Sequence, residues 1–184
     1  MQTSRVMDRE STLSLFMKME SPMVAYDAPR KWVQIARAGE YKGHPAGSFK
    51  FDADAFGRIV ANFDAQKNPV PVKYGHPQGE DDGKPVPAVG WIHNLESRVN
   101  GTQLWAFVEF TSDAAQLIRE GKYRYCSVVV DVESVHRESA KEIGPELLEL
   151  GLVNNPFIDG MEPIRLSRRV LFEKGKPMGL KELL

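Results

Sequence analysis

Hydrophobic and polar residues alternate along several short stretches of the chain, and this pattern predicts a protein built mainly of β-strands. The clearest stretch is 89–110, where two runs of β-forming residues flank Asn100-Gly101. An Asn-Gly pair readily adopts the positive φ angles of a type I′ turn, so the stretch predicts a β-hairpin. Apolar residues occupy alternate positions of its second half and are expected to face the core: Leu104, Ala106, Val108 and Phe110.

Four further segments have strand character, at 31–38, 70–74, 122–132 and 146–153. They are short and rich in Val, Ile, Tyr and Leu, and turn-forming residues follow most of them. Periodicity alone would also allow a helix at 146–153. Its short length and the Asn-Asn-Pro sequence that follows it favour a strand.

Two segments have the helical pattern instead. The first begins after Asp52, a typical N-cap residue, and should end near Gln66, before an Asn-Pro pair. The second is capped by Thr111 or Ser112 and is ended by Gly121 as the left-handed C′ residue. Apolar residues at helical spacing give the two helices one buried face each: Phe56, Ile59, Val60 and Phe63, then Ala115, Leu117 and Ile118. The whole pattern predicts a mixed, mainly antiparallel β fold, a small closed or nearly closed β-barrel with surrounding helices.

Composition narrows the function classes. The chain has 184 residues, enough for one domain with a core and short tails. Its net charge of −1 and scattered basic residues give no reason to expect nucleic acid as a partner. No apolar run is long enough to span a bilayer, so a membrane is not expected either. The single cysteine, Cys126, excludes an internal disulfide and a cysteine-based metal cluster, and suits a reducing compartment.

Two residues suggest hydrolytic chemistry. His76 follows the 70–74 strand in a Gly-His-Pro sequence, where a tight turn would present its imidazole at the rim of the fold. Ser127 lies in the 122–132 strand, and alternation puts its hydroxyl on the face of Tyr125 and Val129. Imidazole and hydroxyl are the base and nucleophile of serine hydrolases. Each residue alone is also consistent with an ordinary turn histidine or a hydroxyl bonded to the backbone.

A carboxylate and a thiol lie in the same two strands. Glu149 interrupts the apolar run 147–153, and an imidazolium partner would offset the cost of burying its charge. The alternative for Glu149 is a solvent-facing position on an edge strand. Cys126 neighbours Ser127 but points to the opposite face by alternation, which is typical of a buried, unreactive cysteine.

A series of short motifs, taken together, resembles the Mu-like phage I proteins, the protease-scaffold proteins of Mu-type phages. They span roughly residues 30–160, and it is their order and spacing that make the resemblance specific. The motifs are VPVKYGH ending at His76, AVGWI and LESR within 88–98, GTQLWAFVE at 101–109, Thr111 with Ala114-Ala115, YRYCS ending at Ser127, and GLVNNP at 151–156.

The resemblance implies a prohead maturation serine protease with the assemblin-type fold of herpesvirus maturation proteases, a β-barrel with surrounding helices. It implies His76 as general base and Ser127 as nucleophile. Glu149 falls on the position of the third residue, which orients the histidine. Backbone N–H groups and an arginine-bound water would hold the oxyanion, and Arg165 is the nearest downstream arginine. No cofactor and no metal are implied.

The resemblance also implies partners and an organisation of the chain. The substrates would be the phage scaffold and major capsid proteins and the chain itself, inside the prohead assembling in the cytoplasm of the bacterial host. Relatives often activate on dimerisation or assembly, which makes a homodimer a candidate active form. We expect an N-terminal extension at 1–24, a protease domain at 25–167, and a tail at 168–184 that is the start or remnant of a scaffold region.

Three other functions remain open from the sequence. The first is a catalytically inactive scaffold or minor capsid assembly protein that keeps the protease-like fold. The second is a metal-dependent peptidase using His76, His93 and the acidic residues at 80–82, although their spacing matches no known ligand pattern. The third is a binding module that recognises its partner through the polar loop 78–87.

Overall fold

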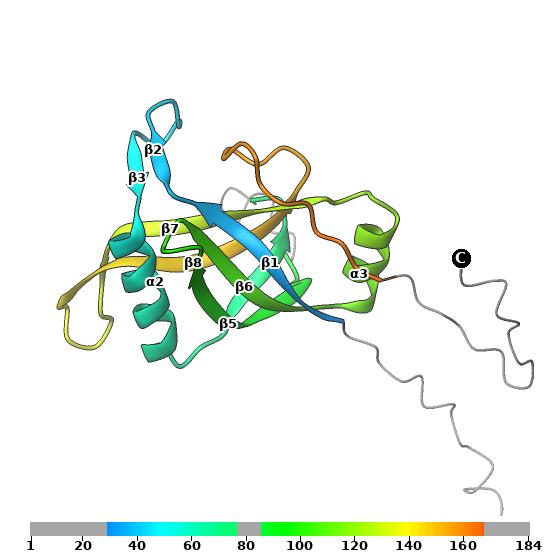
Figure 1. Ribbon diagram of the computed structural model, residues 1–184. Helices are drawn as coiled ribbons and strands as arrows, with labels where there is room; N and C mark the ends of the chain where they lie inside the picture. The colour runs from blue at the N-terminus through cyan, green and yellow to red at the C-terminus, as the bar shows by residue number, and fades with distance from the viewer. Residues whose placement is uncertain (1–28, 77–85, 168–184) are drawn as a thin grey trace, which may run out of the picture.

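The computed structural model describes residues 29–76 and 86–167, which form one curled six-stranded sheet, a small hairpin and two helices (Figure 1). Along the sheet the strand order is β1-β6-β5-β4-β8-β7. The strands are β1 (Arg30–Arg37), β4 (Val70–Tyr74), β5 (Gly90–Arg98), β6 (Gln103–Phe110), β7 (Tyr125–Val135) and β8 (Glu142–Val153). The hairpin is β2 (Gly39–Tyr41) with β3 (Phe49–Phe51), and the helices are α2 (Ala53–Ala65) and α3 (Ser112–Arg119).

Antiparallel pairing dominates the sheet, as the sequence predicts. Four of its five ladders are antiparallel, and only β4 and β8 run parallel. The parallel pair matters for function because it aligns the end of β4, which leads to His76, with the end of β8.

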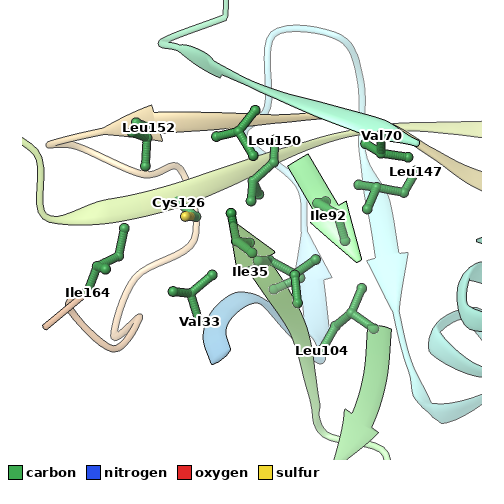
Figure 2. Packing of buried hydrophobic residues seen from close by; sticks show 14 of the residues in the cluster. Val33, Ile35, Val70, Ile92, Leu104, Cys126, Leu147, Leu150, Leu152 and Ile164 are labelled. Atoms are coloured by element: carbon green, nitrogen blue, oxygen red, sulfur yellow. The ribbon is translucent and has the colours of Figure 1, made fainter. Parts of the chain in front are cut away.

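The predicted hairpin around Asn100-Gly101 is confirmed. The N–H of Thr102 donates to the carbonyl of Val99 at 3.1 Å, and the two residues between them have φ angles of 54° and 79°, as a type I′ turn requires. The predicted inward residues of β6 are all fully buried. They pack in one hydrophobic core with residues of the other strands and of the segment that follows β8. Figure 2 shows part of this core: Val33, Ile35, Val70, Ile92, Leu104, Leu147, Leu150, Leu152 and Ile164.

The predicted helix ends are also confirmed, and the two helices lie at opposite ends of the sheet (Figure 1). Asp52 is the N-cap of α2, where its side chain accepts from the N–H of Ala55 at 3.0 Å. Gln66 is the C-cap of the same helix. Thr111, one of the two predicted candidates, caps α3, and Gly121 follows that helix with a φ of 73°. No helix in the part of the chain that the structure describes is long and apolar enough to cross a membrane.

The Asp52 cap gives a testable prediction about acid stability. The hydrogen bond from Ala55, followed by that from Lys50, holds the pKa of the Asp52 carboxyl below its ordinary value of 3.8. A lowered pKa in the folded state means that the cap stabilises fully above 3.8 and is lost as pH falls through the lower folded value. Asp52→Ala should therefore lower the urea midpoint at neutral pH, and its difference from wild type should shrink in acid. Asp52→Asn should retain most of the cap, because asparagine is an equally good N-cap residue.

The expectation of a closed or nearly closed barrel is corrected by the structure, because the sheet curls only into a half-barrel. Within the described residues no ladder joins the edge strands β1 and β7. A segment outside the strands bridges them instead. Glu162 N–H donates to the side chain of Gln34 in β1 at 2.8 Å, and Ile164 N–H donates to the carbonyl of Arg124, just before β7, at 2.7 Å. Its apolar side chains fill the opening and are buried: Ile158, Met161 and Ile164.

Candidate functional site

The register of three neighbouring strands places the candidate site on the outer face of the sheet. Gly151 of β8 pairs with Lys73 of β4 on one side and with Ser127 of β7 on the other. Residues paired in this way direct their side chains to the same face of a sheet. The neighbours that point the other way, such as Cys126 and Leu152, are buried in the core. Ser127 is only partly buried, and its hydroxyl lies on the face opposite the core.

The imidazole of His76 covers Gly151. A Cβ atom built on Gly151 would lie 2.7 Å from Cε1 and 2.9 Å from Nδ1 of His76, so the ring occupies the space of the missing side chain. Because Ser127 pairs with Gly151, the His76 ring lies beside Ser127 on the same face. Both residues therefore lie next to Gly151, and within the described residues no hydrogen bond joins their side chains, so the catalytic pairing of His76 with Ser127 stays a prediction.

The turn after β4 explains how the ring reaches this position. Gly75 has a φ of 66°, a left-handed conformation that side chains disfavour, and its N–H donates to the carbonyl of Leu152 at 2.9 Å. Tyr74, the last residue of β4, stacks on Tyr123 with ring centroids 4.9 Å apart. These contacts anchor the end of β4, and the turn at Gly75 folds His76 back over β8.

Glu149 lies beside His76, as predicted for the third residue. Its Oε1 is 3.6 Å from Nδ1 of His76, and its Oε2 is 2.6 Å from Nζ of Lys73. The Glu149 side chain is 14% exposed, and β8 lies between β4 and β7, so the alternative of a solvent-facing residue on an edge strand is wrong. Nδ1 of His76 is buried, and within the described residues it has no hydrogen-bond partner.

A β-bulge next to Glu149 resets the alternation of β8. Val129 pairs with Glu149 but Val130 pairs with Leu147, so Leu148 is an extra residue in this strand. Leu147 is consequently buried, whereas Leu148 is 42% exposed. Bulges of this kind re-aim side chains and are frequent beside active sites. Here the extra residue lets Leu147 point into the core while Glu149 faces outward beside His76.

Cys126 is directed into the core, as the alternation predicts, and Figure 2 shows it among Leu150, Leu152 and Ile164. The residue is 1% exposed, and burial raises the pKa of its thiol far above the ordinary range. Because the thiolate is the reactive form, this cysteine is a poor nucleophile in the folded protein.

Thiol labelling tests this conclusion about Cys126. We expect iodoacetamide to react with the native protein at least about 100-fold more slowly than with the urea-unfolded chain, because a buried thiol ionises poorly. Intact mass gives the extent of labelling over time. Equal rates in the two states would show that the cysteine is accessible and would return it to consideration as a nucleophile.

Arg165 is exposed and follows Ile164, whose backbone bonds to Arg124 three residues before Ser127. Its backbone therefore lies close in space to the start of β7. Within the described residues its guanidinium makes no hydrogen bond with Ser127 or His76, so its role at the oxyanion stays a prediction.

The features invoked by the alternative functions do not converge on this site within the described residues. His93 lies in β5, where its Nε2 is 3.0 Å from Glu109, and Glu109 also pairs with Arg30 at 2.6 Å. Within 29–76 and 86–167 no group of three or more His, Cys, Asp or Glu side chains is arranged to hold a metal ion. The acidic residues at 80–82, and most of the loop 78–87, lie outside the described residues.

No role was predicted from the sequence for two residues of the site, Gly151 and Lys73. A glycine inside an otherwise apolar strand is a known sign of close approach by another group, and this sign at Gly151 points to the His76 ring. Lys73 carries no such sign, because only the parallel pairing of β4 with β8 brings it to Glu149.

Comparison with known proteins places the chain in a family. Neither the curated proteins nor the solved structures include a match. A family model, described as the N-terminal domain of Mu-like prophage I protein, matches residues 33–165, which is more than half of the chain and contains Lys73, His76, Ser127 and Glu149. The chain therefore belongs to the Mu-like prophage I protein family and carries its N-terminal domain.

Proposed function

We propose that the protein is a serine endopeptidase of phage prohead maturation, with Ser127 as nucleophile and His76 as general base. The observation that carries this proposal is the packing of the His76 ring on Gly151, the residue paired with Ser127. Membership of a phage protein family supports the biological setting. The curled β-sheet with two helices is compatible with an assemblin-like protease fold, which we propose as the finer description.

In the proposed reaction, Ser127 Oγ attacks the carbonyl carbon of a peptide bond while the His76 ring accepts the hydroxyl proton. A C–O bond forms, the C–N bond breaks, and the histidine returns the proton to the leaving amine. Water then attacks the acyl carbon while His76 accepts its proton. The C–O bond to Ser127 breaks, and the histidine returns the proton to Ser127 Oγ. Glu149, 3.6 Å from Nδ1, would orient the ring and stabilise the imidazolium as the two groups close to hydrogen-bond distance. Backbone N–H groups, with Arg165 through a water, would stabilise the oxyanion.

The proposed substrates are the phage scaffold and major capsid proteins, together with the chain itself. The proposed location is the assembling prohead in the cytoplasm of the bacterial host. Confinement in a closed shell gives a high effective concentration, so a modest intrinsic activity would suffice. Activation by homodimerisation or by assembly would keep the enzyme silent before the shell forms.

Co-expression tests the proposal. The chain is produced with the scaffold and major capsid proteins of the same phage, and fragment masses are followed over time. We expect a small set of specific cleavages that a fluorophosphonate blocks and a chelator does not, with the reagent attached to Ser127. Blocking by the chelator alone would instead favour a metal-dependent peptidase.

A non-catalytic assembly role is the second candidate, and one distance favours it. The separation of 3.6 Å between Glu149 and His76 is longer than a hydrogen bond, so this pair is not closed. If assembled proheads contain no fragments while the chain is required for shells of the correct size, the protein is a scaffold or minor capsid component with a protease-like fold.

A further inference from the structure

The carboxylate of Glu149 is shared between two partners. Its Oε2 is 2.6 Å from Nζ of Lys73, a short charge-assisted contact, and its Oε1 faces Nδ1 of His76 at 3.6 Å. The side chain of Lys73 is 27% exposed, that of Glu149 14% and that of His76 30%. Solvent therefore screens the charges of this group only partly. A partly buried carboxylate held by one cation has a restricted orientation.

The fold makes this arrangement specific. Lys73 pairs with Gly151, the residue that the His76 ring covers, and Glu149 lies two residues before Gly151 in the same strand. In the described parts of β4, β8 and β7, the register places three ionisable residues at positions next to Gly151 on this face: Lys73, Glu149 and Tyr125, which is two residues before Ser127. Lys73 is the cationic member of this set.

We infer that Lys73 is a positioning residue, which fixes the Glu149 carboxylate and through it controls the His76 ring. This inference rests on the proposed function, in which His76 is the general base. Two consequences follow. Without the ammonium group, Glu149 loses its fixed orientation, so the ring is held less well during proton transfer. The carboxylate, no longer neutralised by the ammonium group, also attracts the imidazolium form of the ring more strongly.

The test compares Lys73→Met, which keeps the apolar stem, with Lys73→Arg, which keeps the charge. For Lys73→Met we expect kcat to fall about tenfold with KM unchanged, since a small misplacement of a catalytic group is costly. The acidic limb of its kcat/KM profile should move upward by about one pH unit. Lys73→Arg should restore the limb to its wild-type position. The matched control is Lys122→Met, whose ammonium pairs with Glu120 at 2.8 Å on the surface, and it should change neither quantity.

Titration of the His76 ring by NMR gives a readout that needs no activity. Its midpoint should move upward in Lys73→Met and downward in Glu149→Gln, and Lys73→Arg should match wild type. If wild type cleaves through Ser127 but Lys73→Met leaves the limb and the ring titration unmoved, or raises kcat, the inference about Lys73 is wrong. If wild type cleaves nothing in assembled proheads, the proposed function fails, and the ring titration still decides whether Lys73 controls His76 through Glu149.

Discussion

Replacing Ser127 by alanine is expected to remove every specific cleavage of scaffold, capsid and self, with a rate loss of roughly 10⁴-fold or more. The hydroxyl is the only group of this side chain that can form the acyl-enzyme, and methyl in its place leaves His76 without a proton to accept. Ser127 is partly buried on the outer face, so loss of one oxygen atom should leave the fold intact. Fragment masses from co-expressed proheads measure the cleavage, and circular dichroism with a urea titration measures the fold.

The chain offers a matched control for Ser127→Ala. Ser139, in the loop between β7 and β8, also contacts a histidine, with its Oγ 3.1 Å from Nδ1 of His136. This pair is exposed and lacks a carboxylate partner among the described residues. Ser139→Ala should therefore cleave like wild type. If Ser127→Ala cleaves like wild type as well, Ser127 is not the nucleophile, and the buried thiol of Cys126 would not be a ready substitute.

Local chemistry was sufficient to predict most individual elements. The hairpin at Asn100-Gly101 depends on two neighbouring residues that accept positive φ, and the start of α2 depends on one hydrogen bond from Ala55 to Asp52. Period-two alternation also predicted that Cys126 and Ser127 face opposite sides of β7. Each of these features is determined within a few residues, which is the range that a sequence pattern describes reliably.

The features that the sequence did not predict depend on contacts between distant segments. Whether a curled sheet closes depends on what lies between its edges, and here the segment that contains Ile164 occupies that place. The bulge at Leu148 breaks the alternation that a sequence pattern assumes. Lys73 reaches Glu149 only because β4 and β8 are parallel neighbours. The pairing of His76 with Ser127 was predicted through family resemblance, and the structure adds Gly151, which the His76 ring covers and which pairs with Ser127.

Adding a single methyl group at Gly151 is expected to disable the site. The Cβ of Gly151→Ala would meet the His76 ring at 2.7 Å and would also collide with the backbone carbonyl of Gly75. The carbonyl of Gly75 cannot yield without moving the turn, and the ring can yield only by swinging away, so His76 must leave its place on Gly151. We expect at least about a 100-fold loss of cleavage from this displacement. Overpacking should also lower the free energy of unfolding by about 1–3 kcal/mol, measured by urea titration.

Gly57→Ala controls for the substitution itself. Gly57 lies on an exposed turn of α2 with nothing within 4 Å of an added Cβ, so the same change there should leave cleavage unaltered. It should raise stability by up to about 1 kcal/mol, because alanine is the better helix former. A Gly151→Ala protein that is folded at the assay temperature, yet inactive, would separate ring displacement from unfolding. Wild-type cleavage and stability in Gly151→Ala would mean that the His76 ring does not lie on Gly151 in solution, and the observation that carries the proposed function would be lost.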